Sequence, residues 1–123
     1  MELGQDFSLG HEFRWDEPIG EMAQVSIATY GSDDDRVRLA HQFSVSPDSL
    51  EAMSELSTPE VRLAVAGNPR TPPDALRRLA KDHERAVRIA TIHTINSLPE
   101  QLRLAAMPVS ESPLQKLRSR RSA

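Results

Sequence analysis

The stretch that decides the fold is VRLAVAGNPRTPPDALRRLAKD, at residues 61–82. Val61, Ala64 and Val65 follow the spacing of one helical face, and Leu63 widens that apolar face. This spacing fits a helix better than a strand. The first part of the stretch therefore predicts a short amphipathic helix.

The letters that follow predict a break and then a second helix. Gly67 can end the first helix in a left-handed conformation, and the proline at position 69 cannot continue it. Thr71 can cap the next helix through its hydroxyl group. Leu76 and Leu79 then supply the buried stripe of that helix. The stretch as a whole predicts a helix–turn–helix unit.

The same unit occurs three times in the chain. Its opening tetrapeptide, Val-Arg-Leu/Ile-Ala, begins at Val37, Val61 and Val87, with spacings of 24 and 26 residues. Each copy continues through a polar turn to a leucine that begins a second apolar segment. These leucines are Leu50, Leu76 and Leu102. A period of this size predicts a repeat array, in which short helices gain stability by stacking.

Helix starts and stops divide the chain into an arm, a repeat region and a tail. Ser46, Thr58 and Ser97 look like helix starts, and a helix over residues 22–30, ended by Gly31, makes half a repeat. We predict an arm at 1–19, a half-repeat at 20–36, repeats at 37–60, 61–86 and 87–112, and a tail at 113–123. The predicted fold is an all-α solenoid of about three and a half repeats, each 24–26 residues long.

The middle copy resembles the leucine-rich repeat variant family, a bacterial class whose units follow VRxAVAxNPxTPxxxLxxLAxD. The flanking copies match more loosely, with SVSPDSL and HTINSLPEQL at their turns. The resemblance covers about residues 20–112, and it implies α-helices that alternate with shorter, often 3₁₀, helices in a right-handed superhelix. Some members carry a cysteine-rich iron–sulfur segment, which a chain without cysteine cannot supply. The resemblance therefore implies a fold but not an activity.

Composition argues against catalysis and against cofactors. The 123 residues include no cysteine, which excludes disulfides, iron–sulfur clusters and thiolate zinc sites. The four histidines show no HExxH or other close ligand spacing, and the chain has no GxSxG and no phosphate-cradling glycine loop. We predict that the protein is not an enzyme and holds neither a cofactor nor a metal.

No segment reads as a membrane anchor or an export signal. The N-terminus lacks a basic start followed by an apolar run, and no later stretch approaches the ~18 apolar residues of a membrane span. We expect a soluble, cytoplasmic protein.

The sharpest candidate site is a column of arginines, one from each repeat. They are Arg38, Arg62 and Arg88, each at the second position of its tetrapeptide. Stacked helices would line these guanidinium groups along one surface, where they could hold carboxylates or phosphates. In the alternative, which we favour, each arginine pairs with an acid of a preceding turn and braces neighbouring repeats. The candidate acids are Asp35, Glu60 and Glu84.

The two ends of the chain offer further candidates. The acidic arm contains Phe13 and Trp15, and it either folds back over the first helix as a cap or anchors a partner. The basic tail contains Arg120 and Arg121, which are either solvated or lie along nucleic acid or an acidic protein.

These patterns predict a binding module. The first hypothesis is a small adaptor that recognises another protein through the arginine column, with the aromatic residues of the arm. The alternative is nucleic-acid binding through the arginine column and the basic tail, against which the net charge of −3 argues. We expect no membrane partner, and a homodimer that extends the stack is compatible with so few repeats.

Overall fold

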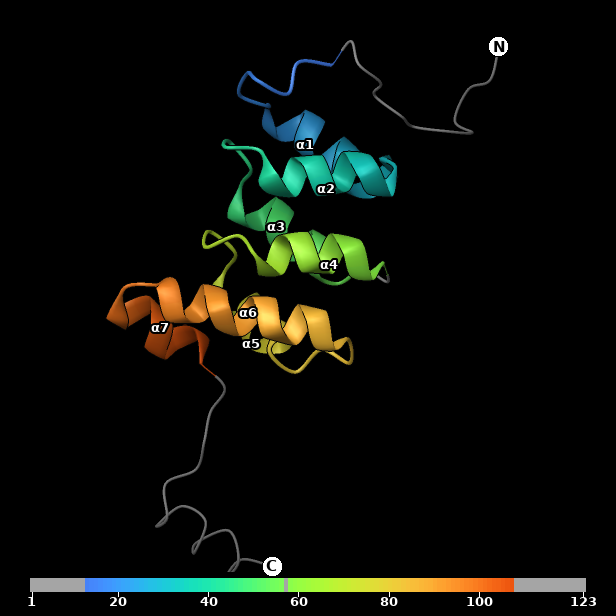
Figure 1. Ribbon diagram of the computed structural model, residues 1–123. Coiled ribbons are helices and arrows are strands. Elements are labelled where there is room, and N and C mark those ends of the chain that lie inside the picture. The colour runs from blue at the N-terminus through green and yellow to red at the C-terminus, as the bar shows by residue number, and fades with distance from the viewer. Residues whose placement is uncertain (1–12, 57, 108–123) are drawn as a thin grey trace, which may run out of the picture.

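A computed structural model describes residues 13–56 and 58–107 of the chain (Figure 1). Within these ranges every regular element is a helix. The helices are α1 (Glu21–Tyr30), α2 (Asp33–His41), α3 (Pro47–Ser54), α4 (Pro59–Ala66), α5 (Pro73–Leu79), α6 (Arg85–Ser97) and α7 (Glu100–Ala106). The predicted all-α repeat solenoid is confirmed. The expectation of 3₁₀ helices is wrong for the described residues, because all seven helices are α-helices.

The helices form two layers (Figure 1). Helices α2, α4 and α6 stack on one another, and we call them the first-helix layer. Helices α1, α3, α5 and α7 stack behind them as the second-helix layer. Helix α1 thus belongs to the second layer, and no first-layer helix precedes it within the described residues.

The structural period is 26 residues. Helices α2, α4 and α6 begin at residues 33, 59 and 85, and helices α3 and α5 begin at residues 47 and 73. The Val-Arg motif does not follow this period throughout. Val61 and Val87 lie two residues inside their helices, whereas Val37 lies four residues inside α2. The spacing of 24 residues in the sequence therefore reflects a shift of the motif along α2.

One hydrogen bond recurs at the same period and joins each first-layer helix to the one before it. The Asn68 side chain donates to the carbonyl of Ala40 at 2.8 Å, and the Thr94 hydroxyl donates to the carbonyl of Ala66 at 2.6 Å. Gln42 occupies this register in α2, and its amide donates to the carbonyl of Glu17 at 2.7 Å. The segment before α1 is thus attached to the stack as another repeat would be.

Serine side chains start two of the helices: Ser46 caps α3 as predicted, and Ser32, which was not predicted, caps α2. Ser32 and Ser46 each accept a hydrogen bond from the backbone amide three residues later, which stabilises an amide that the helix leaves unpaired. The predicted start at Ser97 is wrong, because α6 continues through Ser97 and α7 begins at Glu100.

The turn of the middle repeat differs from its prediction. Thr71 does not cap α5; its hydroxyl donates to the carbonyl of Val65 at 2.7 Å and so ties the turn to the end of α4. The N-cap position is Pro72. Gly67 ends α4 with φ of −82°, so it adopts a right-handed and not a left-handed conformation.

Gly31 is required by a close approach of the backbone. Its amide donates to the carbonyl of Ile27 at 2.8 Å where α1 ends. A Cβ atom at this position would lie 2.5 Å from that carbonyl oxygen. A side chain would therefore force the junction between α1 and α2 to open.

The core lies between the two layers and is aliphatic. Leu39, Val61, Val65 and Val87 contribute to it from the first-helix layer, where each is 0–1% exposed. Ile27, Leu50, Met53 and Leu79 face them from the second-helix layer. A smaller cluster of Leu76, Ile95 and Ala106 joins the last two repeats. No helix in the described part of the chain is both long and apolar enough to span a membrane.

Residues 13–19 cover the N-terminal end of this core. Ile19 is buried, and Phe13 and Trp15 pack partly buried against the main cluster. The two rings meet edge to face, with their centroids 4.8 Å apart. The buried amide of Gln24 donates to the carbonyls of Ile19 and Ser44, at 2.8 and 3.2 Å, and so fastens this segment to the first repeat. We call residues 13–19 the N-terminal cap.

Candidate interaction surfaces

The arginines of the Val-Arg motif do not form one column. Arg62 and Arg88 each lie three residues after the start of their helix, but Arg38 lies five residues after the start of α2. The residue that shares the register of Arg62 and Arg88 is Arg36. The predicted column of Arg38, Arg62 and Arg88 is therefore replaced by Arg36, Arg62 and Arg88, which we call the arginine ladder.

Arg62 is the most buried member of the ladder, with 6% of its surface exposed. Its Nε and Nη2 groups donate to the two carboxylate oxygens of Asp82 at 2.8 and 3.2 Å, and Nη1 donates to the carbonyl of Leu56 at 2.9 Å. This two-pronged geometry suits the planar guanidinium group. The predicted acids do not make this contact: the partner comes from the turn after α5.

The Asp82 carboxylate is held in its charged form. Burial raises the pKa of Asp82. The hydrogen bonds from Arg62 and from the backbone amide of Glu84 lower it by more, so the pKa lies below the ordinary value for aspartate. The charge on this buried pair is thus part of the folded structure.

The other two ladder arginines bind backbone carbonyls. Arg36 donates to the carbonyls of Ala28 and Thr29, at 3.1 and 2.9 Å. Arg88 donates to the carbonyl of Asp82 at 2.7 Å. Each ladder arginine thus binds a carbonyl at the end of, or just after, the preceding second-layer helix, where carbonyls lack helical partners. The ladder thus joins the two layers, but not through the predicted pairs with Asp35, Glu60 or Glu84.

Arg38 has a different environment from the ladder. Its side chain is exposed, and the described residues offer it no hydrogen bond or ion pair. It borders an open hollow of about 430 Å³ between the N-terminal cap and α2. Trp15, Val37, Arg38, His41 and Gln42 line this hollow. The structure therefore brings together two of the predicted binding residues, Trp15 and Arg38, and separates Arg38 from Arg62.

Phe13 and Trp15 serve the cap, and Trp15 also faces the hollow. The indole Nε1–H of Trp15 is buried and has no acceptor among the described residues. A buried donor without a partner carries a desolvation cost. Phe13 borders a different hollow, together with Pro18 and Ile19, and does not line this one.

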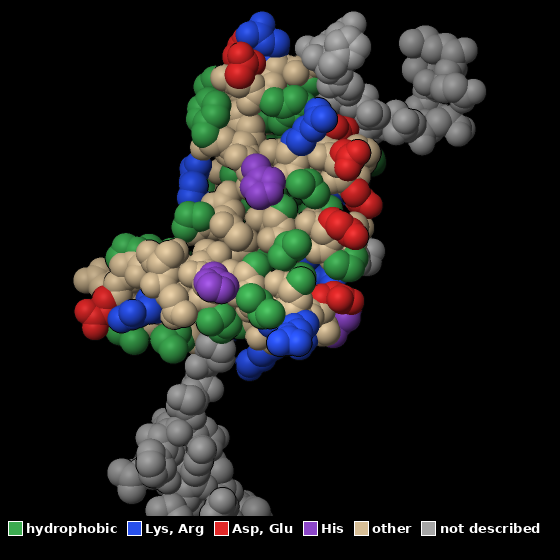
Figure 2. Space-filling view, viewed as in Figure 1, with side chains coloured by type: hydrophobic (Ala, Val, Ile, Leu, Met, Phe, Trp, Pro, Cys, Tyr) green, Lys and Arg blue, Asp and Glu red, His purple; other side chains and the backbone are tan. Residues whose placement is uncertain are grey.

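The outer face of the first-helix layer carries an apolar column. Val37, Leu63 and Ile89 share one register on α2, α4 and α6, and Leu63 and Ile89 are 40% and 46% exposed. Ile92 extends the column along α6, where it is 44% exposed. We call these four residues the outer column. Figure 2 shows hydrophobic side chains gathered over this layer.

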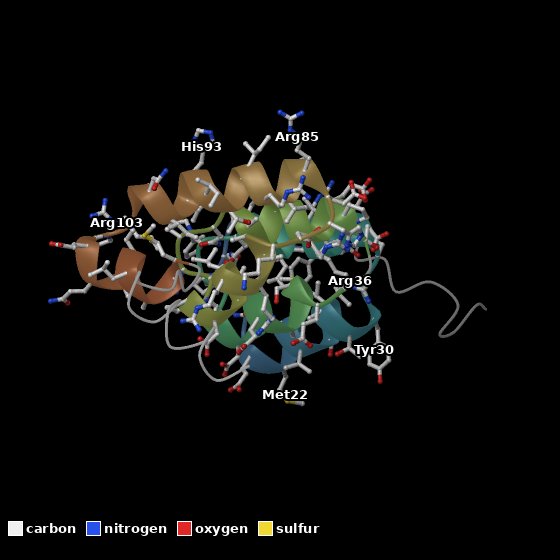
Figure 3. All side chains as sticks on the ribbon, turned by 90° about the horizontal axis from the view of Figure 1, so that it is seen from below. Met22, Tyr30, Arg36, Arg85, His93 and Arg103 are labelled. Atoms are coloured by element: carbon white, nitrogen blue, oxygen red, sulfur yellow. The ribbon has the colours of Figure 1, made fainter. Side chains whose placement is uncertain are left out.

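Polar groups surround the outer column. Asp34 and Glu60 lie exposed near the N-terminal ends of α2 and α4, and His41 and His93 lie near the C-terminal ends of α2 and α6. Figure 3 shows Arg85 and His93 pointing away from the second-helix layer. In the described part of the chain, no group of three or more His, Asp or Glu residues is placed to hold a metal ion.

Two of the predicted site residues cannot be placed, and one exposed surface was not predicted. Arg120 and Arg121 lie outside the described residues. The sequence analysis does not predict the outer column, although Leu63 widens the apolar face of its helix. The signal that could have found it is a large aliphatic residue off the buried stripe in each repeat, counted at 26 residues.

Comparison with known proteins identifies the middle repeat. The family described as leucine rich repeat variant matches residues 59–84. This range begins at the first residue of α4 and ends just before α6, so it covers one structural repeat. Neither the curated proteins nor the solved structures contain a match to the chain. The protein is thus a helical solenoid whose middle repeat, residues 59–84, matches the leucine rich repeat variant family.

Proposed function

We propose that this protein is a non-enzymatic interaction module that binds another protein through the outer face of its first-helix layer. The observation that carries this proposal is the outer column of Val37, Leu63, Ile89 and Ile92. Stacking of the repeats buries the inner face of each helix, but it does not require large aliphatic residues on the outer face. Aliphatic side chains recur there at one register, which supports a shared role.

The surroundings of the column fit a protein interface. Interfaces between proteins combine an apolar centre with a polar rim. Here the rim is supplied by Asp34 and Glu60 along one edge and by His41 and His93 along the other. Figure 2 shows the acidic side chains toward the edge where the first-layer helices begin.

The charges favour a protein partner over nucleic acid. A phosphate backbone is bound by accessible Lys and Arg side chains. The arginine ladder donates instead to Asp82 and to backbone carbonyls within the fold. The exposed acids at the edge of the outer face would repel phosphates.

The test is site-specific crosslinking followed by direct binding. A photoreactive phenylalanine replaces Leu63 in one variant and Ala52, which is exposed on α3 in the other layer, in the control. In the native host we expect a nuclease-resistant protein adduct at position 63 and none at position 52. Purified Leu63→Lys should bind the captured protein at least ~10-fold more weakly, since a charge replaces an apolar contact, while Ala52→Lys should bind normally. Adducts to nucleic acid, equal yields at both positions, or unchanged binding by Leu63→Lys would each overturn the proposal.

A further inference from the structure

Next to the N-terminal cap, the first repeat has a residue that the other two repeats lack. Arg38 occupies the register at which the middle and third repeats have Ala64 and Ala90. A long cationic side chain thus stands where the fold elsewhere places a methyl group. The arginine ladder does not explain it, because Arg36 fills the ladder position of this repeat.

The wall of the hollow beside Arg38 is fixed in place. The side-chain amide of Gln42 donates to the carbonyls of Trp15 and Glu17, and its oxygen accepts from the backbone amide of Ser44 at 2.7 Å. Its hydrogen-bonding groups are therefore used within the fold. Trp15 packs partly buried against the core. The wall formed by Gln42 and Trp15 is therefore set by the fold.

The groups that remain available in the hollow are cationic or apolar. Arg38 has no partner among the described residues, and His41 is exposed beside it. Val37 and the indole ring of Trp15 supply the apolar surface. None of the described residues that line the hollow is acidic. A ligand that fits these groups carries a negative oxygen next to an apolar body.

We propose that this hollow binds a carboxylate side chain of the partner protein, presented between apolar residues. The planar guanidinium group of Arg38 matches the two oxygens of a carboxylate, and the neighbouring apolar residues of the partner pack on Val37 and on the indole ring. This inference rests on the proposed function and adds the chemistry of recognition at the first-repeat end of the outer face. The hollow continues that face, because Val37 belongs to both.

Trp15 is the single tryptophan of the chain, so its fluorescence reports on the hollow directly. The full chain is titrated with acetyl-Leu-Glu-Leu-amide and with acetyl-Leu-Gln-Leu-amide, which differ only in the carboxylate. We expect a saturable change in the Trp15 emission with the Glu peptide. Binding of the Gln peptide should be about tenfold weaker, since the charge-assisted hydrogen bond is lost. Equal binding of the two peptides, or no saturable change with either, would overturn the inference.

A matched pair of variants assigns the effect to Arg38. Arg38→Gln removes the cation from the hollow, and Arg85→Gln removes one exposed arginine from α6, on the same layer but beyond α4 (Figure 3). Both variants change the net charge equally, and both side chains are exposed, so thermal melting should show that both fold. We expect Arg38→Gln to bind the Glu peptide about tenfold more weakly and Arg85→Gln to bind it as the unaltered chain does. Equal losses in the two variants would contradict a specific site.

The outcomes separate this inference from the proposed function. If Leu63→Lys weakens binding of the captured partner but Arg38→Gln does not, the outer face is an interface and the hollow is not part of it. If the Glu peptide binds in an Arg38-dependent manner but position 63 yields no protein adduct, the carboxylate site stands and the outer column is not its interface.

Discussion

The first and middle repeats contain the same tetrapeptide, Val-Arg-Leu-Ala, in different environments. In the middle repeat Arg62 is buried and forms a bidentate ion pair with Asp82. In the first repeat Arg38 is exposed beside the N-terminal cap. The difference arises because the motif begins two residues further along α2 than along α4. The start of the helix, and not the matching letters, determines which side chain enters the core.

The two repeats also brace their layers with different chemistry. Arg36 takes the ladder position in the first repeat and binds two carbonyls at the end of α1. Arg62 binds one carbonyl and a buried carboxylate. At the register of Asp82 the first repeat has Leu56. The middle repeat thus depends on an ion pair that the first repeat does without.

Arg62→Met should give the largest loss of stability. It removes one partner of a buried pair and leaves the Asp82 carboxylate uncompensated, which costs ~3–5 kcal/mol in the free energy of unfolding. Arg38→Met, the matched change in the first repeat, should alter stability by no more than about 0.5 kcal/mol, as is usual for exposed positions. Urea denaturation of the two variants checks the comparison. Similar losses for both would show that the motif, and not the register, determines the role of the arginine.

A leucine pair extends the comparison to the third repeat. Leu76 is the fourth residue of α5 and is fully buried, whereas Leu102 is the third residue of α7 and is 47% exposed. Leu76→Ala should cost about 3 kcal/mol through lost burial and a residual cavity. Leu102→Ala should cost less than about 1 kcal/mol, because much of its side chain is already in water. Equal losses would show that Leu102 is covered in the intact protein.

How much the sequence predicts follows from these same residues. The repeat, the two helices per unit and the Ser46 cap were predictable, because apolar spacing and capping chemistry are local. The register was not predictable from the motif, since a shift of two residues in α2 leaves the letters unchanged. Leu50 and Leu76 are spaced by the structural period of 26 residues, because each is the fourth residue of its helix. They therefore predict the register better than the Val-Arg motif does.

The candidate site depends on contacts that no local pattern contains. Trp15 and Arg38 border one hollow only because Gln42 ties the cap to the end of α2. Asp82 reaches Arg62 because the turn after α5 returns to the first-helix layer. Both contacts join residues 20 or more positions apart, so they could be found only once the fold was known.

The pH dependence of stability should separate the middle repeat from the first. The pKa of Asp82 is lowered in the folded protein below the ordinary value of about 4. Its contribution is therefore fully present above about pH 4 and is lost as the pH falls through the lowered folded pKa. The gap in stability between the unaltered chain and Asp82→Asn should be constant near neutral pH and close in acid. Urea midpoints from pH 6 to pH 2 measure it, and a gap that persists at pH 2 would show that the charge of Asp82 is not what stabilises the fold.

The smallest expected effect concerns the joints between repeats. Asn68 joins the middle repeat to the first and Thr94 joins the third to the middle, each through one hydrogen bond to a carbonyl of the preceding helix. Thr94→Val preserves the shape of the side chain and leaves only the carbonyl of Ala66 unpaired, which should cost about 1 kcal/mol. Asn68→Ala should cost slightly more, because Asn68 also accepts from the amide of Arg70 at 2.8 Å. Urea denaturation measures both losses, and hydrogen exchange shows where they act. If each variant raises exchange mainly at its own joint, the solenoid is a chain of separable contacts between neighbours; if both raise exchange throughout, the two joints are parts of one cooperative unit.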